Sequence, residues 1–154
     1  MSESLNILPE LIEATREGVD FYAEAADAVT DSELSKLFRR MAQAKSTLVE
    51  ELSHEVKPAR TPKVRSSKRV AKPAEWVAHI NSTYTTLRTG LKAIKQDQVT
   101  QIEQAESDLL GRVQRIRHDR DHSYVVRVLA MQYEAKARAV HEGLRARKRR
   151  LAAG

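Results

Sequence analysis

The chain has 154 residues and a formal net charge of +6, with 31% charged, 41% hydrophobic and 5% aromatic residues. This length predicts one domain, residues 1–154, and the scarcity of Gly and Pro beside many Ala, Leu, Glu, Lys and Arg favours an all-α fold. The absence of Cys excludes disulfides, thiolate metal ligands and thiol catalysis. With no signal-peptide pattern and no apolar run of membrane-spanning length, we expect a cytoplasmic protein that makes no membrane contact.

The first third of the chain predicts a helical hairpin. Small and apolar residues recur at three- and four-residue steps after Pro9, which suits a first helical position, and predict a helix over residues 8–29. The run TDSE at residues 30–33 has the pattern of a capping box and predicts the start of a helix over residues 32–56. A turn this short makes the two helices antiparallel.

The second part of the chain predicts a connector and three further helices. Residues 57–73, KPARTPKVRSSKRVAKP, hold three Pro, seven Lys or Arg and no acid, which is typical of a flexible basic linker. Apolar stripes predict helices over residues 74–95, 97–117 and 123–149. Two hairpins joined by about forty residues suit a ferritin-like four-helix bundle with a long crossover that carries an extra helix. A plain up-down bundle and a helical dimer are the alternatives.

Residues 11–52, LIEATREGVDFYAEAADAVTDSELSKLFRRMAQAKSTLVEEL, resemble the opening hairpin of an uncharacterised bacterial ferritin-like family, the domain of unknown function 2383. The resemblance extends over about residues 6–149, through a short crossover helix at 76–91. The matching features are Leu11-Ile12, Gly18 with the aromatic after it, Ala25-Ala26, Leu34, Phe38 with Arg39-Arg40, Ala42, Glu51-Leu52, Glu103 with Glu106, and Gln132 with His141. The long basic linker and the basic tail depart from the family pattern. The resemblance implies a ferritin-like bundle and brings no established activity.

The ELSH run at residues 51–54 has the Glu-x-x-His spacing of a ferritin-type di-iron ligand pair. Such a centre needs four carboxylates and two imidazoles that converge inside the bundle. The candidate ligands are Glu17, Glu51, His54, Glu103, Glu106 and His141. At about 100° per residue, only Glu106 lies on the apolar stripe of its helix, whereas His54 lies about 160° from the centre of its own. We therefore expect no complete di-iron site and no cofactor, with a di-iron metal-binding or oxidase protein as the alternative.

Two lysines also lie on apolar stripes near mid-helix, at the level of Glu106. Because a buried carboxylate needs a cation or a proton, we expect Glu106 to pair with Lys45, Lys136 or both, within about 6 Å. The alternative is that both lysine stems follow the apolar seam and their amines reach water. Further hydrogen bonds in this buried polar cluster are expected from Thr15, Tyr22 and Gln132.

His118 and His122, with Asp119 and Asp121 between them, form a separate hypothesis. Their spacing suits a surface site for a divalent cation, and the alternative is a pair of solvated loop histidines.

The charge is distributed unevenly. Residues 1–56 have a net charge of −7 and residues 57–154 a net charge of +13. The basic segments suggest nucleic-acid binding, which the lack of stacking aromatics there does not favour. The alternatives are attraction between the two halves of the molecule or to another subunit. The candidate nucleic-acid residues are Lys63, Arg65, Lys68, Arg69, Arg145, Arg147, Lys148, Arg149 and Arg150.

The sequence has no Ser/His/Asp signature and no Gly-rich phosphate loop. We therefore expect a non-enzymatic bundle protein, a binding or stress-related accessory protein without a complete di-iron site. A homodimer is the partner expectation, since ferritin-like bundles often pair side by side.

Overall fold

The computed structural model of the protein describes residues 2–56 and 74–153, with side chains for residues 7–56 and 74–151. Within these ranges the chain forms only helices, so the all-α bundle predicted from the sequence is confirmed. The helices are α1 (Ser2–Ala28), α2 (Ser32–Glu55), α3 (Glu75–Arg88), α4 (Gln96–His118) and α5 (Tyr124–Ala153). The predicted linker, residues 57–73, lies outside the described residues.

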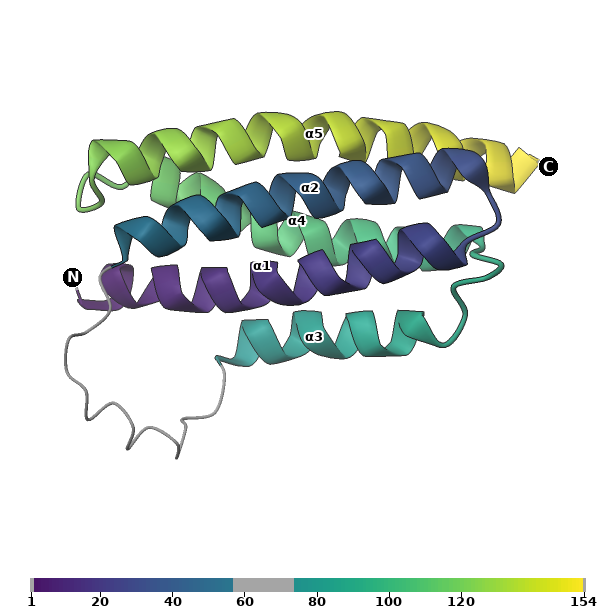
Figure 1. Ribbon diagram of the computed structural model, residues 1–154, viewed down its shortest axis with the longest axis horizontal. Helices are drawn as coiled ribbons and strands as arrows, with labels where there is room; N and C mark the ends of the chain where they lie inside the picture. Colours follow the sequence, from purple (N-terminus) through teal and green to yellow (C-terminus); the bar gives the residue numbers. More distant parts are fainter. Residues whose placement is uncertain (1, 57–73, 154) are drawn as a thin grey trace.

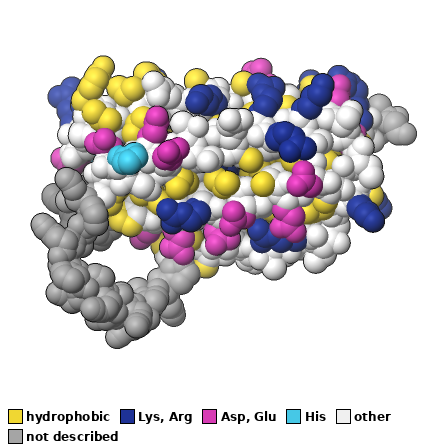
Figure 2. All heavy atoms as spheres, viewed as in Figure 1, with side chains coloured by type: hydrophobic (Ala, Val, Ile, Leu, Met, Phe, Trp, Pro, Cys, Tyr) yellow, Lys and Arg dark blue, Asp and Glu magenta, His cyan; other side chains and the backbone are white. Residues whose placement is uncertain are grey.

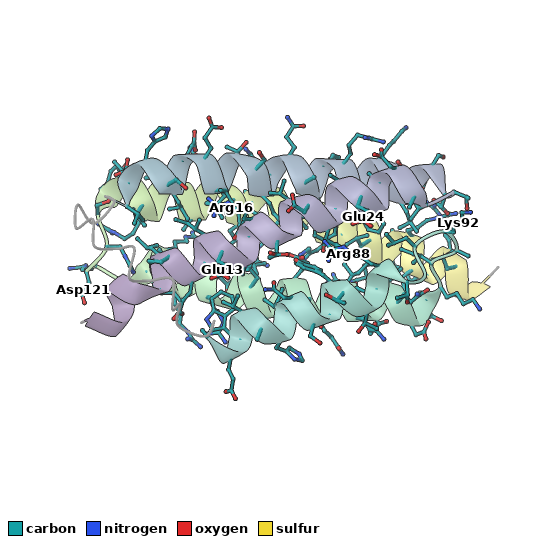
Figure 3. All side chains as sticks on the ribbon, turned by 60° about the horizontal axis from the view of Figure 1, so that its bottom comes forward. Glu13, Arg16, Glu24, Arg88, Lys92 and Asp121 are labelled. Atoms are coloured by element: carbon teal, nitrogen blue, oxygen red, sulfur yellow. The ribbon has the colours of Figure 1, made fainter. Side chains whose placement is uncertain are left out.

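Four long helices lie side by side along the long axis of the molecule, and the shorter α3 runs along one edge (Figure 1). The main packing partners are α1 with α2, α4 with α5, and α2 with α5, while α3 packs on α1 and α4. The α3 helix therefore covers the bundle. In Figure 3, Arg88 of α3 lies beside Glu24 of α1, and their Nε and Oε1 atoms are 2.9 Å apart.

The core forms because each helix carries apolar residues at three- and four-residue steps, which lie on one face of a helix. On α3, for example, the buried residues are Val77, Ile80, Tyr84 and Leu87. Aromatic rings meet where α3 packs on α1, with Phe21 stacked on Tyr84 at a centroid distance of 4.6 Å. This layer lies beside the polar centre of the bundle.

Three predicted helix boundaries are wrong. The α1 helix begins at Ser2, so Pro9 lies inside it and costs one hydrogen bond rather than marking the start. The α3 helix ends at Arg88 instead of residue 95. Leu91 and Ile94 lie in the turn that follows α3 and are buried there. Their spacing continues the apolar pattern of α3, so the sequence predicted a longer helix. The α5 helix continues to Ala153, past the predicted residue 149.

The start of α2 is capped by Asp31, one residue after the Thr that the capping-box pattern pointed to. The Asp31 carboxylate accepts a hydrogen bond from the backbone N–H of Leu34 at 3.0 Å, which satisfies a donor that the first turn leaves open. Arg147 of α5 donates two hydrogen bonds to the other Asp31 oxygen, so the cap also ties α5 to the α1–α2 turn.

Among the helices of the described ranges, none combines the length and the apolar character needed to cross a membrane.

Candidate functional site: a buried lysine–glutamate cluster

An ion pair lies at the centre of the bundle, between Lys45 of α2 and Glu106 of α4. The Lys45 Nζ is 2.8 Å from Glu106 Oε1, and the two side chains are 0% and 1% exposed. Lys45 also donates a hydrogen bond to the hydroxyl of Tyr133 on α5 at 2.9 Å. The hydroxyls of Tyr22 on α1 and Tyr84 on α3 both donate to Glu106 Oε2, at 2.5 and 2.8 Å. All five helices thus contribute to these five residues, which we call the Lys45–Glu106 cluster.

Gly18 of α1 makes room for the lysine stem. A Cβ atom at this position would lie 2.7 Å from Cδ and 3.0 Å from Cε of Lys45, and 3.1 Å from the hydroxyl of Tyr84. The 2.7 Å contact is closer than real Cβ atoms show, and the other two are tight, so the Lys45 stem would have to shift. No glycine in the described chain has a positive φ angle. Glycine is therefore required here for space and not for backbone conformation.

Both members of the ion pair are charged at neutral pH. Burial alone would raise the pKa of Glu106, but the Lys45 ammonium and the hydrogen bonds from Lys45, Tyr22 and Tyr84 outweigh it and lower the pKa below the usual 4.5. Burial likewise acts to lower the pKa of Lys45, and the charge of Glu106 with the contacts of Tyr133 raises it above the usual 10.5. The bundle interior therefore holds a carboxylate and an ammonium over a wide pH range.

The three tyrosines remain protonated and act as hydrogen-bond partners. Burial, followed by the charge of Glu106, raises the pKa of Tyr22 and of Tyr84 well above 10.0. Burial raises the pKa of Tyr133 to about 12, against the opposing effect of the Lys45 ammonium. The Tyr133 hydroxyl accepts from Lys45 and donates toward the sulfur of Met41 at 3.9 Å. The phenols therefore complete the solvation of the ion pair.

The cluster differs in membership from the one predicted. Its Lys45, Glu106 and Tyr22 were named from the sequence, whereas Lys136 and Gln132 are exposed and were wrongly included. The inward face of α5 includes Tyr133, Ala137 and Val140, which are buried. Position 136 lies off this face of the helix and points outward.

Thr15 is buried but contributes nothing to the ion pair, because its hydroxyl donates to the Leu11 carbonyl of its own helix at 2.6 Å. Sequence reasoning missed Tyr84 and Tyr133 as cluster members. Both lie among apolar residues at helical spacing, where the sequence pattern of a tyrosine is that of a core residue, although a buried tyrosine hydroxyl usually finds a partner.

The six candidate iron ligands do not converge. Glu51 and His54 are exposed, and Glu17 is only half-buried. Glu103 is half-buried and pairs with Lys148 Nζ at 2.6 Å. Within residues 7–56 and 74–151, no group of three or more His, Cys, Asp or Glu side chains is placed to hold a metal ion.

Two remaining candidate ligands lie deeper in the bundle. Both oxygens of Glu106 are taken by Lys45 and the tyrosines. His141 is half-buried, its Nε2 has no hydrogen-bond partner, and burial is the main cause that lowers its pKa. The donor set therefore does not fit a di-iron centre.

The hypothesis of a surface cation site at His118 and His122 is wrong, and so is the alternative of two solvated loop histidines. His122 is buried at 4% exposure and its Nε2 lies 3.9 Å from Asp119 Oδ2, whereas His118 is exposed. The tight turn between α4 and α5 turns His122 inward, so the two imidazoles do not share one surface.

The basic tail of α5 is largely neutralised within the molecule. Its ion pairs are Arg147 with Asp31, Arg150 with Glu33, and both Arg145 and Lys148 with Glu103. Arg149 is exposed, and Lys63, Arg65, Lys68 and Arg69 lie outside the described residues. The pairs of Arg147 with Asp31 and of Arg150 with Glu33 join the basic part of the chain to the acidic part, whereas Glu103 belongs to the basic part itself. The first two pairs favour attraction between the two halves of the chain as the explanation of the uneven charge.

A second buried carboxylate, Glu134 of α5, lies off the apolar stripe that the sequence shows, yet it is 5% exposed. Gln114 and Arg117 of α4 and Arg138 of α5 donate to it at 2.9, 2.6 and 2.7 Å. Burial would raise the pKa of Glu134, but these hydrogen bonds outweigh it and lower the pKa to about 2. The group is a permanent anion that fastens α4 to α5.

Comparison with known proteins adds a family match. The model of the family described as Domain of unknown function (DUF2383) matches residues 3–119 of the chain. No curated protein and no solved structure matches the chain.

Proposed function

Since the chain belongs to the DUF2383 family, whose description assigns no activity, we propose a function for it from the geometry of the Lys45–Glu106 cluster. The protein is a ferritin-like bundle that works without metal, as a cytoplasmic binding or stress-related accessory protein and not as an enzyme. The family match spans α1 to α4 and therefore includes both members of the ion pair.

The observation that carries this proposal is the fully buried ammonium of Lys45. In ferritin-like metalloproteins, glutamates from facing helices converge at the bundle centre and their charge is balanced by metal ions. Here an ammonium that is covalently part of the chain balances Glu106, and its stem occupies the space beside Gly18. A metal ion would have to displace this ammonium, and among the described residues no group of carboxylates and imidazoles is placed to hold it.

The protonation states support a non-catalytic role. General acid–base catalysis needs a group whose pKa lies near the working pH and that reaches a substrate. The pKa of Glu106 is lowered, those of Lys45 and the three tyrosines are raised, and all five side chains are buried. These side chains form hydrogen bonds with one another, which is typical of a structural core.

The test is anaerobic loading of the full chain with Fe(II), followed by desalting and metal analysis. We expect iron well below one per chain, and no rise in melting temperature, because a ligand stabilises only the state that binds it. Retention of about two irons per chain, as in a di-iron bundle, would overturn the proposal.

A further inference from the structure

A groove on the outside of the bundle, between α2 and α5, lies apart from the Lys45–Glu106 cluster. It is open to solvent and has a volume of about 470 Å³, comparable to that of small-ligand sites. Its lining includes four small or apolar side chains and two cationic ones, namely Ala44, Ala135, Ala139, Val140, Arg40 and Lys136. We call it the α2–α5 groove.

The two cations of this groove have no counter-ion in the described part of the chain. No acidic residue lines the groove, and neither Arg40 nor Lys136 forms an ion pair with a described residue. Their sequence neighbours behave differently, since Arg39 and Arg138 both pair with carboxylates, at 3.5 and 2.7 Å. The groove is therefore a local site of unbalanced positive charge.

The cations come from opposite walls and lie at nearly the same level. The α2 and α5 helices run antiparallel, and Lys45 meets Tyr133 across the interface. In this antiparallel register Lys136 lies level with Ala42, two residues (about 3 Å along the axis) from Arg40. Both long side chains line the groove at nearly this level, so one anionic headgroup can contact both.

An apolar strip leads out of the groove along α5. Tyr124, Val125 and Met131 are 73%, 47% and 43% exposed, the large apolar side chains that the described part of the chain leaves to solvent. Met131, Ala135 and Ala139 follow at four-residue steps and so lie on one face of the helix. Figure 2 shows apolar side chains gathered over the first turns of α5, with basic side chains further along it.

We propose that the α2–α5 groove binds a free long-chain carboxylate. The carboxylate contacts Arg40 and Lys136, and the aliphatic chain lies over Ala139, Ala135 and Met131. The proposal rests on the binding role proposed above and gives it a ligand class. The apolar strip is one helix face wide, which suits a single chain, whereas an amphipathic helix about 10 Å across needs a wider trough.

The test is calorimetric titration of the full chain with dodecanoate below its micellar concentration. We expect saturable binding at one site and no binding of dodecyltrimethylammonium, which has the same chain and the opposite charge. Arg40→Gln and Lys136→Gln each remove one charged partner of the carboxylate and should weaken binding about tenfold. The matched control is Arg16→Gln, which removes an exposed positive charge from α1 (Figure 3) that forms no ion pair with a described residue, and it should bind like the wild type.

A groove-filling variant, Ala139→Trp, should abolish binding while circular dichroism shows an intact helical fold. Equal binding of both amphiphiles, equal losses in Arg16→Gln and the groove variants, or unchanged binding by Ala139→Trp would overturn the proposal. Binding to phosphatidylglycerol vesicles without binding of dodecanoate would overturn it in favour of a membrane surface. Iron uptake would refute the proposed function and leave this titration unaffected, so the two failures are distinguishable.

Discussion

Replacing Lys45 with Met is the most direct test of the cluster's energetics. Methionine has a similar length and no charge, so Lys45→Met keeps most of the packing and leaves the buried Glu106 without its partner at 2.8 Å. Removing one member of a buried ion pair costs about 3–5 kcal/mol. A domain of this size has a free energy of unfolding of about 5–15 kcal/mol, so the variant should be strongly destabilised at pH 7.

The pH dependence of this loss has a defined sign. In the wild type the pKa of Glu106 is lowered, so its stabilising contribution is present above the unfolded value of 4.5 and is lost as the pH falls through the folded pKa. In Lys45→Met, burial dominates and raises that pKa, so the variant loses stability as the pH rises above 4.5. The two proteins should therefore differ most at neutral pH and least in acid.

The assay is urea unfolding followed by circular dichroism at pH 7 and at about pH 4.5, with Lys36→Met as an exposed lysine control on the same helix. The control should stay within about 0.5 kcal/mol of the wild type. In a double-mutant cycle with Glu106→Gln, the double variant should recover about 2 kcal/mol relative to additivity. A loss below about 1 kcal/mol for Lys45→Met, or an unchanged pH slope, would refute the reasoning.

Three further predictions concern single side chains and are all measured by urea unfolding. Gly18→Ala places a Cβ 2.7 Å from the Lys45 stem and should lower the free energy of unfolding by about 1–3 kcal/mol. In the control Gly111→Ala the added Cβ meets nothing within 4 Å, so this variant should be neutral or stabilising. Equal effects of the two substitutions would contradict the steric explanation. Tyr84→Phe removes a 2.8 Å donor to a buried carboxylate and should cost about 1.5–3 kcal/mol, so a neutral result would mean that this hydrogen bond contributes nothing. Asp31→Ala removes the α2 cap and should cost about 1–2 kcal/mol at pH 7. Burial acts to raise the pKa of Asp31, but hydrogen bonds from Arg147 and from the helix N–H lower it overall. The difference in unfolding free energy between the wild type and Asp31→Ala should therefore shrink as the pH falls through the folded pKa of Asp31. A pH-independent difference would contradict the role of the charge.

The all-α fold was predictable because apolar residues at three- and four-residue steps favour helices. The same pattern failed for single residues of α5, where Lys136 is exposed and Glu134 is buried. The boundaries were less predictable, since Leu91 and Ile94 are buried from a turn and continue the spacing of α3 beyond its end. Pro9 misled in a similar way, because a proline is tolerated inside α1 at the cost of one hydrogen bond. Burial periodicity identifies a face, and it does not report whether the backbone there is helical.

The cluster was predictable only in part. Glu106 and Lys45 were visible because a charged residue on an apolar stripe needs an opposite charge. Tyr84 and Tyr133 were not, because a tyrosine on such a stripe has the same pattern as a purely apolar residue. Whether the hydroxyls of Tyr84 and Tyr133 reach the ion pair depends on how α3 and α5 pack against α2 and α4. The sequence pattern of a single helix does not predict that packing.

Gly18 also constrains the order in which this core can change through mutation. A side chain at position 18 collides with the stem of Lys45. A shorter, uncharged residue at position 45 leaves the buried carboxylate of Glu106 without its cation. Neutralising Glu106 first leaves the ammonium of Lys45 with only a phenol as partner. Each first step is expected to lower stability, so substitutions at the three positions should be non-additive. A lineage that converts this core to another chemistry then passes through destabilised intermediates or replaces all three residues together.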